Sequence, residues 1–423
     1  MNDQTLIPAA QHGIAVQQLC PHATEVVSRL QQAGYEAYIV GGSVRDLLLG
    51  KVPKDFDVAT DATPEEIKVV FPRCHLIGRR FRLAHVRLRG VLVEVATFRG
   101  QHGKAGGGRE HADGRILRDN VWGSLEEDAR RRDFTINALF MDPVSGDIRD
   151  FVGGYDDLES RRLRLIGDPV TRYREDAVRL LRAARFVAKL GVEPDPATAK
   201  PIPELAPLLE HIPPARLFEE TCKLFLTGHA ARTLESMQRF QLTRSLFPVL
   251  RGKGARGKAE IGPMLVRAMA NTDGRVAEEK SVTPAFLYAS ILWQPVRDRA
   301  HELQSAGDAE AIALDRAAEE ILGRQARRTA LPRRFSSVTR QIWTMQARLR
   351  KTQGRRALKV LTHPKFRAAY DFLLLRVAED ESLAELAEFW TEAQRHPAPA
   401  ARGKPRRRRR RRRKPRSGTG EGS

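Results

Sequence analysis

The stretch GGSVRDLLLGKVPKDFDVAT, residues 41–60, decides the fold. It follows a short apolar run, AYIV (37–40), which has the length of a buried strand. The two glycines predict a tight turn into a helix over SVRDLLLG (43–50), because a final glycine typically ends a helix. Residues 55–59 then alternate polar and apolar side chains and predict a second strand. This order of elements indicates a compact mixed α/β unit.

Two carboxylates, Asp55 and Asp57, stand at alternate positions of the second predicted strand. Alternate residues of a strand point to the same face, so both acids would lie together while Phe56 faces the core. Paired carboxylate oxygens suit Mg²⁺, and such a pair can hold two ions for phosphoryl transfer. An acidic pair on a strand is also often simply solvated, so this spacing alone leaves both interpretations open.

The glycines ahead of the acidic pair change that balance. Gly41 and Gly42 allow backbone N–H groups to approach an anion, and the following helix adds its positive end. Arg45 lies in the first turn of that helix and can pair with phosphate. A glycine pair by itself could be only a tight turn. Together with Arg45 and the two aspartates it predicts a triphosphate cradle beside a metal site.

A third acid interrupts an otherwise apolar strand. Glu94 lies inside VLVEVATF (91–98), which we expect to pair with a strand over HVRLRG (85–90). A glutamate flanked by valines is either a metal ligand or one half of a cross-strand ion pair. The nearby acidic pair favours a ligand or a closely supporting residue.

Two later segments are rich in hydrogen-bond donors and acceptors. In RRRDFTINA (130–138), Asp133 and Asn137 could meet a ribose, phosphates or a base. The segment EDAVRLLRAARF (175–186) predicts an amphipathic helix.

The polar positions of that helix recur every three residues, so we expect them near one face. Such a face is either an ordinary salt-bridged helix surface or a polar edge that imitates a template base. In the second case a carboxylate would accept from an exocyclic amine and an arginine would donate to ring acceptors. The residues concerned are Asp176, Arg179, Arg182 and Arg185.

The chain is strongly basic, with a formal net charge of +21 over 423 residues. Residues 396–423 carry +11 of this charge, including eight consecutive arginines, Arg406 to Arg413. Proline, glycine and like charges cannot bury enough apolar area to fold, so we expect a disordered tail. It would serve as a sequence-independent RNA tether or only as a solubility tail. The rest of the chain is basic as well, which favours nucleic acid as partner over an anionic membrane.

Other features exclude several classes of protein. Three scattered cysteines give neither a disulfide framework nor a zinc site. The N-terminus lacks the pattern of a secretory leader, and the longest apolar stretch, near Ala285–Trp293, is too short to span a bilayer. Residues 101–115 are glycine-rich and polar and predict a mobile loop. We therefore expect a cytoplasmic protein with no transmembrane segment.

In this order, the motifs resemble the bacterial branch of the polymerase-β superfamily that includes CCA-adding enzymes and poly(A) polymerases. The segment LIGRRFRLAHV (76–86) is similar to the poly(A) polymerases rather than to their CCA-adding relatives. The segments IPPARLFEE (212–220) and HPKFRAAYD (363–371) resemble the helical body of the same enzymes. The motifs that carry the resemblance are GGSVRD (41–46), DFDVAT (55–60), EVATFR (94–99), RRDFTINAL (131–139), DFVGGYDDL (150–158) and REDAVRLLRAARF (174–186).

The resemblance implies an α+β protein. A small, mixed, palm-like nucleotidyltransferase head would occupy residues 1–160, and an all-α neck that recognises the base and RNA would occupy 161–228. A helical body and tail over 229–395 would bind RNA, and 396–423 would form the disordered Arg-rich end.

The resemblance also implies roles for individual residues. Asp55 and Asp57 would hold the metal ions with Glu94 as third acid, and Asp133 would belong to the active site. The remaining roles fall into three groups: Gly41, Gly42 and Arg45 at the triphosphate; Asn137, Asp176 and Arg179 at the nucleoside; and Arg182, Arg185, Arg406 and Arg413 on RNA.

The implied reaction is template-independent addition of AMP from ATP to RNA 3′ ends, with two Mg²⁺ ions, or Mn²⁺ as substitute, and release of pyrophosphate. Such tails mark bacterial mRNA and other RNAs for decay, which implies contact with RNA-decay machinery; we expect a monomer. A CCA-adding tRNA nucleotidyltransferase is the nearest alternative, and a non-catalytic RNA-binding protein is a second. The GRRF segment and the basic tail favour poly(A), and the intact acids disfavour a binder.

Overall fold

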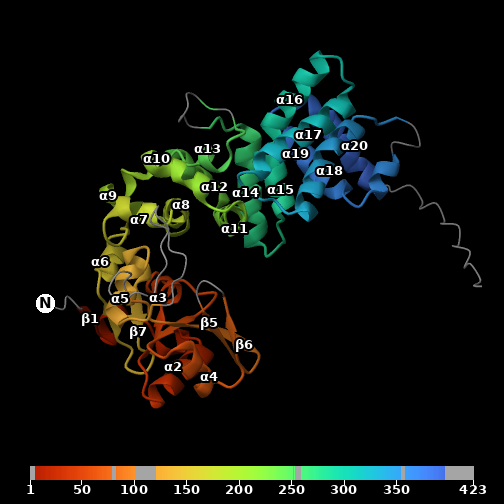
Figure 1. Ribbon diagram of the computed structural model, residues 1–423. Coiled ribbons are helices and arrows are strands. Elements are labelled where there is room, and N and C mark those ends of the chain that lie inside the picture. The colour runs from red at the N-terminus through yellow and green to blue at the C-terminus, as the bar shows by residue number, and fades with distance from the viewer. Residues whose placement is uncertain are drawn as a thin grey trace, which may run out of the picture.

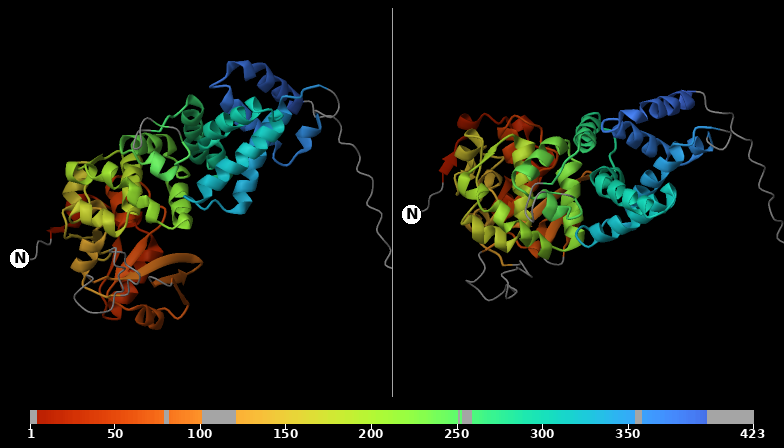
Figure 2. Two further views of the ribbon diagram at one scale, coloured as in Figure 1. Left: turned by 45° about the horizontal axis from the view of Figure 1, so that its top comes forward. Right: turned by 90° about the horizontal axis from the view of Figure 1, so that it is seen from above.

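The structure is a computed structural model of the chain. It describes residues 5–78, 82–100, 121–250, 252, 259–353 and 358–395. A head that contains a sheet is followed by a helical neck and then by a helical body, so the molecule is elongated and curved (Figure 1). Two turned views also place the head and the body at separate ends (Figure 2). The predicted α+β class is confirmed.

Eight strands of the described residues form one mixed sheet in the head, in the order β1-β8-β7-β2-β3-β6-β5-β4. Its centre is β2 (Ala37–Val40), β3 (Asp57–Thr60) and β6 (Val91–Thr97). β3 runs antiparallel to β2 but parallel to β6, and a parallel pair needs a crossover connection. The outer strands are β1 (Thr5–Ile7), β4 (Cys74–Ile77), β5 (Leu83–Leu88), β7 (Leu139–Met141) and β8 (Ile148–Asp150).

Helices cover both faces of this sheet. On one face, α2 (Pro21–Gln32) and α4 (Pro64–Val70) pack on the strands and share their apolar core. On the other face, α5 (Leu125–Arg131) packs with the aromatic side chains of the sheet. Asp57 alternates with Val58, which belongs to the first core, so its carboxylate lies on the α5 face. The remaining short helices at the N-terminus are α1 (Ala9–His12) and η1 (Val16–Gln18).

Short elements join the sheet to the neck. α3 (Gly42–Leu48) starts where β2 ends and contacts β7 and the 3₁₀ turn η2 (Thr135–Asn137). α6 (Gly154–Glu159) packs on η2 and on β9 (Arg162–Leu163). These contacts hold the loop that carries Asp133 and Asn137 against the start of α3.

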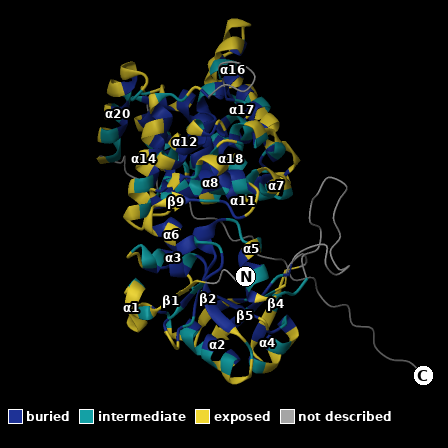
Figure 3. Ribbon diagram, turned by 90° about the vertical axis from the view of Figure 1, so that its left-hand side faces the viewer, coloured by how far each residue is buried: buried dark blue, intermediate teal, exposed yellow. Residues whose placement is uncertain are grey.

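The neck is built around α8 (Val178–Leu190), which follows α7 (Pro169–Glu175) and ends at Gly191 with φ of +68°. α8 buries its apolar side and packs on α11 and α12, and it lies among buried segments in Figure 3. The other neck elements are β10 (Glu193–Pro194), α9 (Pro196–Ala199), α10 (Ile202–Leu205), η3 (Ala206–His211) and α11 (Pro214–Phe225).

The body is all helical within the residues that the structure describes. No helix in this part of the chain is both long and apolar enough to cross a membrane. Its elements are α12 (Ala230–Arg239), α13 (Thr243–Leu246), α14 (Pro263–Ala277), α15 (Pro284–Ile291), α16 (Trp293–Ser305), α17 (Glu310–Ala326), α18 (Arg333–Leu349), η4 (Leu358–Thr362), α19 (Phe366–Arg376), η5 (Glu381–Leu383) and α20 (Ala384–Arg395).

Two sequence predictions need correction. The second strand was predicted from Asp55, but β3 begins at Asp57 because its partner β2 ends at Val40, opposite Asp57. The predicted helix over 175–186 is broken, since Glu175 ends α7 and Val178 starts α8, leaving Asp176 extended between them at φ −150° and ψ 98°. The predicted loop at 101–115, the arginines of the GRRF segment (79–80) with Phe81, and the tail at 396–423 lie outside the described residues.

Candidate active site

The glycine turn and the acids meet at one end of β2 and β3. Val40, the last residue of β2, pairs with Asp57, the first residue of β3. Gly41 follows Val40 directly, so the turn begins beside Asp57. On the other side, the parallel register between β3 and β6 places Glu94 next to Asp57. The sheet therefore brings the turn and two acids together from three separate segments.

The turn requires a glycine at position 41. Gly41 has φ of +76° and ψ of −120°, a conformation that residues with a Cβ atom rarely adopt. A Cβ atom there would also lie 3.3 Å from Nη1 of Arg132. The arginine thus lies directly against the turn, and its positive charge acts on the carboxylate of Asp57. A cation and exposed backbone next to acids are suited to a phosphate that carries metal ions.

Asp57 lies among like charges. Its pKa is raised to about 6, first because surrounding protein displaces water from the carboxylate, and then because Glu94 and Asp55 are negative. Arg132 opposes the shift but does not cancel it. The side chain is still accessible to solvent. Mutually repelling carboxylates at an accessible position have the chemistry of a cation site.

The acids fit a divalent metal as an open pair rather than as a closed cage. Across the described ranges, no group of three or more His, Cys, Asp and Glu side chains is close enough to hold a metal ion. Asp55 and Asp57 can supply carboxylate oxygens, and the remaining ligand positions would fall to water and substrate phosphates. Magnesium sites that act on nucleotides are commonly built in this way.

Glu94 has a partner across the sheet. Its Oε1 lies 3.5 Å from Nε2 of His85, which is its paired residue on β5. A role as a metal ligand or supporting acid and a role in a cross-strand ion pair, the two interpretations considered for Glu94, therefore each have support. It faces a cross-strand histidine, and it contributes negative charge at Asp57.

A buried polar network joins α3 to η2. Arg45 is 3% exposed and donates from Nη1 to Oδ1 of Asn137 and from Nε and Nη2 to Asp46. Asn137 in turn donates from Nδ2 to Asp133 at 3.0 Å. Asp46 also pairs with Lys189 of α8. The structure thus places Arg45 inside the protein, where it fixes Asn137.

The network continues from Asp133 into the neck. Its Oδ1 accepts from the backbone N–H of Phe134, and its Oδ2 pairs with Arg182 of α8 at 2.6 Å. Burial alone would raise the pKa of Asp133. Arg182 and the hydrogen bonds from Asn137 and Phe134 outweigh that effect and lower the pKa to about 2. Asp133 is therefore a firmly ionised anchor between the head and the neck.

The end of α7 holds a second set of pairs. Glu175 accepts from Arg172 at 2.5 Å and from Arg179 at 3.0 Å. Arg179 also donates to the carbonyl oxygen of Arg172, and Arg172 donates to the carbonyl oxygens of residues 131 and 132. Arg179 is thereby held rigidly, and α7 is fastened to the segment that carries Asp133.

Asp176 is paired with an arginine that is distant in sequence. Its two carboxylate oxygens accept from Nη1 and Nη2 of Arg216 on α11, at 3.0 and 2.6 Å. Oδ1 also accepts from the backbone N–H of Val178 at the start of α8. This capping contact explains the break in the predicted helix, because aspartate side chains compete with helical hydrogen bonding. The Asp176–Arg179 salt bridge considered from spacing is absent from the described contacts.

Arg182 and Arg185 follow Arg179 on α8 as predicted. Their guanidinium carbons each lie 5.2 Å from the ring centre of Phe186, and so does that of Arg45. Burial, and then the charge of Arg182, lower the pKa of Arg185. Three guanidinium groups thus surround one aromatic ring, and two of them are already paired, Arg182 with Asp133 and Arg45 with Asp46.

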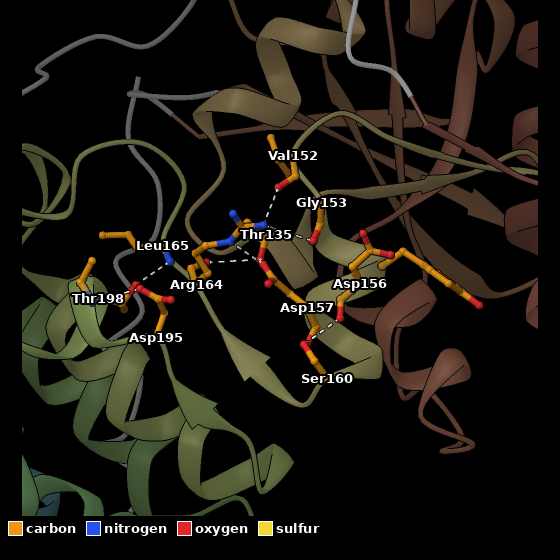
Figure 4. Close-up of polar contacts among 12 residues, drawn as sticks. Thr135, Val152, Gly153, Asp156, Asp157, Ser160, Arg164, Leu165, Asp195 and Thr198 are labelled. Atoms are coloured by element: carbon orange, nitrogen blue, oxygen red, sulfur yellow. Dashed lines mark hydrogen bonds and ion pairs between the residues drawn. The ribbon is translucent and has the colours of Figure 1, made fainter.

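The segment that follows β8 contacts Thr135 of η2 (Figure 4). Asp157 accepts from the hydroxyl of Thr135 and from Nε of Arg164, each at 2.7 Å. A Cβ atom at Gly154 would lie 2.2 Å from the carbonyl oxygen of Thr135, so only glycine permits this approach. The motif at 150–158 therefore locks η2, and with it Asn137, in place.

Sequence reasoning missed three arginines that organise this site. Arg132 was recognised only as part of a basic run, and its position against Gly41 depends on tertiary structure. Arg216 had no signal beyond its charge, because its partner is 40 positions away. For Arg172 the spacing to Glu175 allows a local pair, but its contacts with the backbone carbonyls of residues 131 and 132 depend on tertiary structure. Arg406 and Arg413, predicted to bind RNA, lie outside the described residues.

Comparisons with known proteins agree with this geometry. Residues 37–164 match the model of the "Poly A polymerase head domain", and 306–417 match the "Polymerase A arginine-rich C-terminus". Residues 191–252 match a model described as "Probable RNA and SrmB- binding site of polymerase A". The chain is 46% identical to poly(A) polymerase I of Salmonella typhimurium over 407 residues, 94% of this chain and 88% of that protein.

CCA-adding enzymes are similar over less of the sequence. The enzyme of Geobacillus stearothermophilus is 41% identical over 231 residues, which are 55% of this chain and 55% of that enzyme. The crystal structure of the Bacillus stearothermophilus CCA-adding enzyme with CTP matches with a TM-score of 0.60 at 27% identity. That match covers 89% of this chain and 83% of the crystallised chain.

The mixed head sheet, the acids beside a glycine turn and the helical neck define a nucleotidyltransferase, a class that acts on nucleotides with divalent metal ions. Within this class, the chain belongs to the poly(A) polymerase I family. The predicted family is thereby confirmed.

Proposed function

We propose that the protein adds AMP from ATP, without a template, to the 3′ ends of mRNA and other RNAs. The observation that carries this proposal is the 46% identity to poly(A) polymerase I across 94% of the chain, with both aspartates intact at the glycine turn. The 3′-hydroxyl of the RNA attacks the α-phosphorus of ATP, a phosphodiester bond forms, and pyrophosphate leaves. Repetition lengthens the tail.

Asp55 and Asp57 would hold two Mg²⁺ ions, or Mn²⁺ in their place, with Glu94 in support. When bound, the metal neutralises phosphate charge and lowers the pKa of the attacking hydroxyl. The raised pKa of Asp57 supports this assignment, because carboxylates that repel one another gain most from a cation.

The chain's own residues would place ATP. Gly41 and Gly42 offer backbone to the triphosphate, and Arg132 adds a cation beside them. The buried Arg45 would act by holding Asn137 toward the nucleoside. Asp133 would serve as the active-site anchor that fixes Asn137 and Arg182 together.

Asp176 and Arg179 would select the base. Arg216 fixes the carboxylate of Asp176, and Glu175 fixes the guanidinium of Arg179. Donors and acceptors in fixed positions reject a base whose own donors and acceptors do not match them. Arg182 and Arg185 would then contact the RNA end on the same side of α8.

We further propose a division of labour along the chain. Residues 1–160 carry out catalysis, 161–228 read the nucleotide, 229–395 hold RNA, and 396–423 tether it. The protein would act in the cytoplasm as a monomer and pass tailed RNAs to the decay machinery.

One assay tests the product directly. The full-length protein is incubated with Mg²⁺, a short RNA or tRNA, and each nucleotide separately. A long ladder with ATP alone supports poly(A) addition. A stop after two C and one A on tRNA would assign a CCA-adding enzyme instead, and absence of extension would leave only RNA binding.

A further inference from the structure

A pocket of about 320 Å³ lies in the body, between α16, α17, α18 and α19. These helices are at the end of the molecule away from the head sheet that holds Asp55 and Asp57 (Figure 1). The lining includes Trp293, Gln346 and Arg376, with Arg297 and Arg350 beside them. The pocket is therefore separate from the proposed catalytic site.

Arg376 is held firmly at this pocket. It is only 9% exposed, and its guanidinium carbon lies 4.9 Å from the ring centre of Trp293. Nη1 donates to Oε1 of Gln346 at 3.1 Å. The amide nitrogen of Gln346 donates to the carbonyl oxygens of Ile342 and Ala369, which fixes its oxygen as the acceptor.

Arg376 forms no ion pair with an acid among the described residues, whereas its neighbours do, and only the more distant charges of Asp380 and Glu310 partly offset its own. Arg297 pairs with Glu379 at 3.0 Å, and Arg350 pairs with Glu310 at 3.3 Å. Arg376 has one hydrogen bond, to a neutral amide, out of five possible donors. None of its nitrogens is both buried and without a partner, so the unused N–H groups open onto the pocket.

A buried cation without an anion is costly to keep. Burial, and then repulsion by Arg350, lower the pKa of Arg376 to about 10. The guanidinium nevertheless lies on an aromatic ring, in contact with a pocket whose other charged residues are already paired. Among the described residues no carboxylate is paired with this guanidinium, so an external anion can face it.

We propose that this pocket binds a phosphate group. A planar guanidinium donates two parallel N–H bonds to phosphate oxygens, and Arg376 is pre-oriented for such a contact by Trp293 and Gln346. The rim acids, Asp298 and Glu310, are each near an arginine that balances their charge. The phosphate is either a backbone phosphate of RNA held upstream of its 3′ end, which rests on the proposed function, or that of a free nucleotide or phosphate ion.

The first test uses thermal unfolding of the full-length protein without Mg²⁺, with and without inorganic phosphate. Saturating phosphate raises the Tm of the wild type by about 2 °C. Arg376→Met removes this shift and leaves the Tm without phosphate unchanged or higher, since an unpaired charge has gone. Arg367→Met is the matched control, because Arg367 is on the same helix but 72% exposed and paired with Asp371. An equal phosphate shift in wild type and Arg376→Met overturns the proposal.

Arg376→Lys covers the case in which the methionine variant does not fold. It keeps the charge but loses the fork, so it retains a smaller phosphate shift than the wild type. A full shift in Arg376→Lys counts against the proposal. Neither measurement depends on catalysis. The phosphate site can therefore be disproved while the nucleotidyltransferase assignment stands, and the proposed polymerase activity can be disproved while the phosphate site stands.

The second test identifies the source of the phosphate. If it is RNA, Arg376→Met lowers the slope of log affinity against log salt by about 0.7, the value for one phosphate contact on a single strand. An unchanged slope, with the Tm shift by inorganic phosphate or ATP still abolished, assigns the pocket to free phosphate or nucleotide. If the variant changes neither the slope nor the Tm shift, the site is overturned.

Discussion

At the edge of the head sheet, Asp57 has two other carboxylates as neighbours, whereas Asp133, in the loop that joins the sheet to the neck, has an arginine, an amide and a backbone N–H. The first surroundings raise a carboxyl pKa to about 6, and the second lower one to about 2. Both residues lie near the same glycine turn, so the contrast is not a matter of location. It reflects what each carboxylate is paired with.

The contrast separates two roles that an acidic residue can have. Asp133, Glu175 and Asp176 are paired with arginines and therefore hold α7, α8 and α11 together. Asp57 is instead repelled by Glu94 and Asp55 and therefore has a reason to bind a cation. Removing an acid beside the glycine turn should thus damage chemistry and spare the fold, while removing an acid that is paired with an arginine should damage the fold.

The largest expected effect is on catalysis in the head. Asp57→Ala should lower AMP incorporation about a thousand-fold, because metal stabilisation of transferring phosphates is worth several kcal/mol. Its Tm without metal should be equal to or above that of the wild type, since repulsion with Glu94 and Asp55 is relieved. Gel assays and thermal unfolding check the two parts. Near-normal turnover would remove Asp57 from the metal site.

The next largest effect is on stability at the junction between head and neck. Asp133→Ala leaves Arg182 without its partner and should lower the free energy of unfolding by about 3 kcal/mol. Urea unfolding of the two proteins measures this difference. Asp156→Ala is the control, because Asp156 is an exposed acid of α6 and its loss should change stability by less than about 0.5 kcal/mol. Equal losses in the two variants would show that the anchor is unimportant.

The same anchor predicts a dependence on pH. The pKa of Asp133 is lowered from 3.8 to about 2, so ionisation favours the folded state. This contribution, about 2 kcal/mol, is full above about pH 5 and is lost as the pH falls from about 4 toward 2. The stability difference between wild type and Asp133→Asn should therefore shrink at about pH 3. A difference that stays constant over this range contradicts the assignment.

Sequence alone predicts the head site because its signals are local. Residues 37–60 contain a strand, a glycine turn, a helix and an acidic pair in unbroken order. The prediction was wrong only for Asp55, which lies before β3 and not in it. The strand begins at Asp57 because its partner β2 ends opposite that residue. The strands β7 and β8 were missed because three residues are too few to establish an alternating pattern.

The neck could be predicted only as a helical region. Periodicity gives the face of α8 but not the partner of each charge. The partner of Asp176 is Arg216 on another helix, and the partner of Asp133 is Arg182, 49 residues away. Spacing left open a salt bridge along one face of this helix, and in the structure Arg179 pairs with Glu175. Tertiary packing, which no local pattern contains, decides these pairs.

A smaller effect is expected on the choice of nucleotide, and it should distinguish a neck residue that selects the base from one that only stabilises the neck. Arg179→Ala should reduce the preference for ATP over other nucleotides about ten-fold, while RNA affinity changes little. Single-nucleotide incorporation with each of the four substrates measures the preference. Arg174→Ala serves as control, because Arg174 lies on α7 but is exposed. An unchanged preference in Arg179→Ala would leave Arg179 as a structural residue like Arg172.

The smallest effect on the rate of AMP incorporation should come from the basic C-terminus, which contains none of the acids compared above. Deletion of residues 402–416 removes twelve lysines and arginines, so the slope of log RNA affinity against log salt should fall by about 0.7 for each phosphate that the tail neutralises in the full chain. At saturating RNA the rate of AMP incorporation should stay near that of the full chain, because the head acids and the neck anchors are intact. Filter binding over a range of salt, with turnover at saturation, measures both. An unchanged slope contradicts the tether, and a large fall in saturated turnover would mean that the tail contributes to the active site itself.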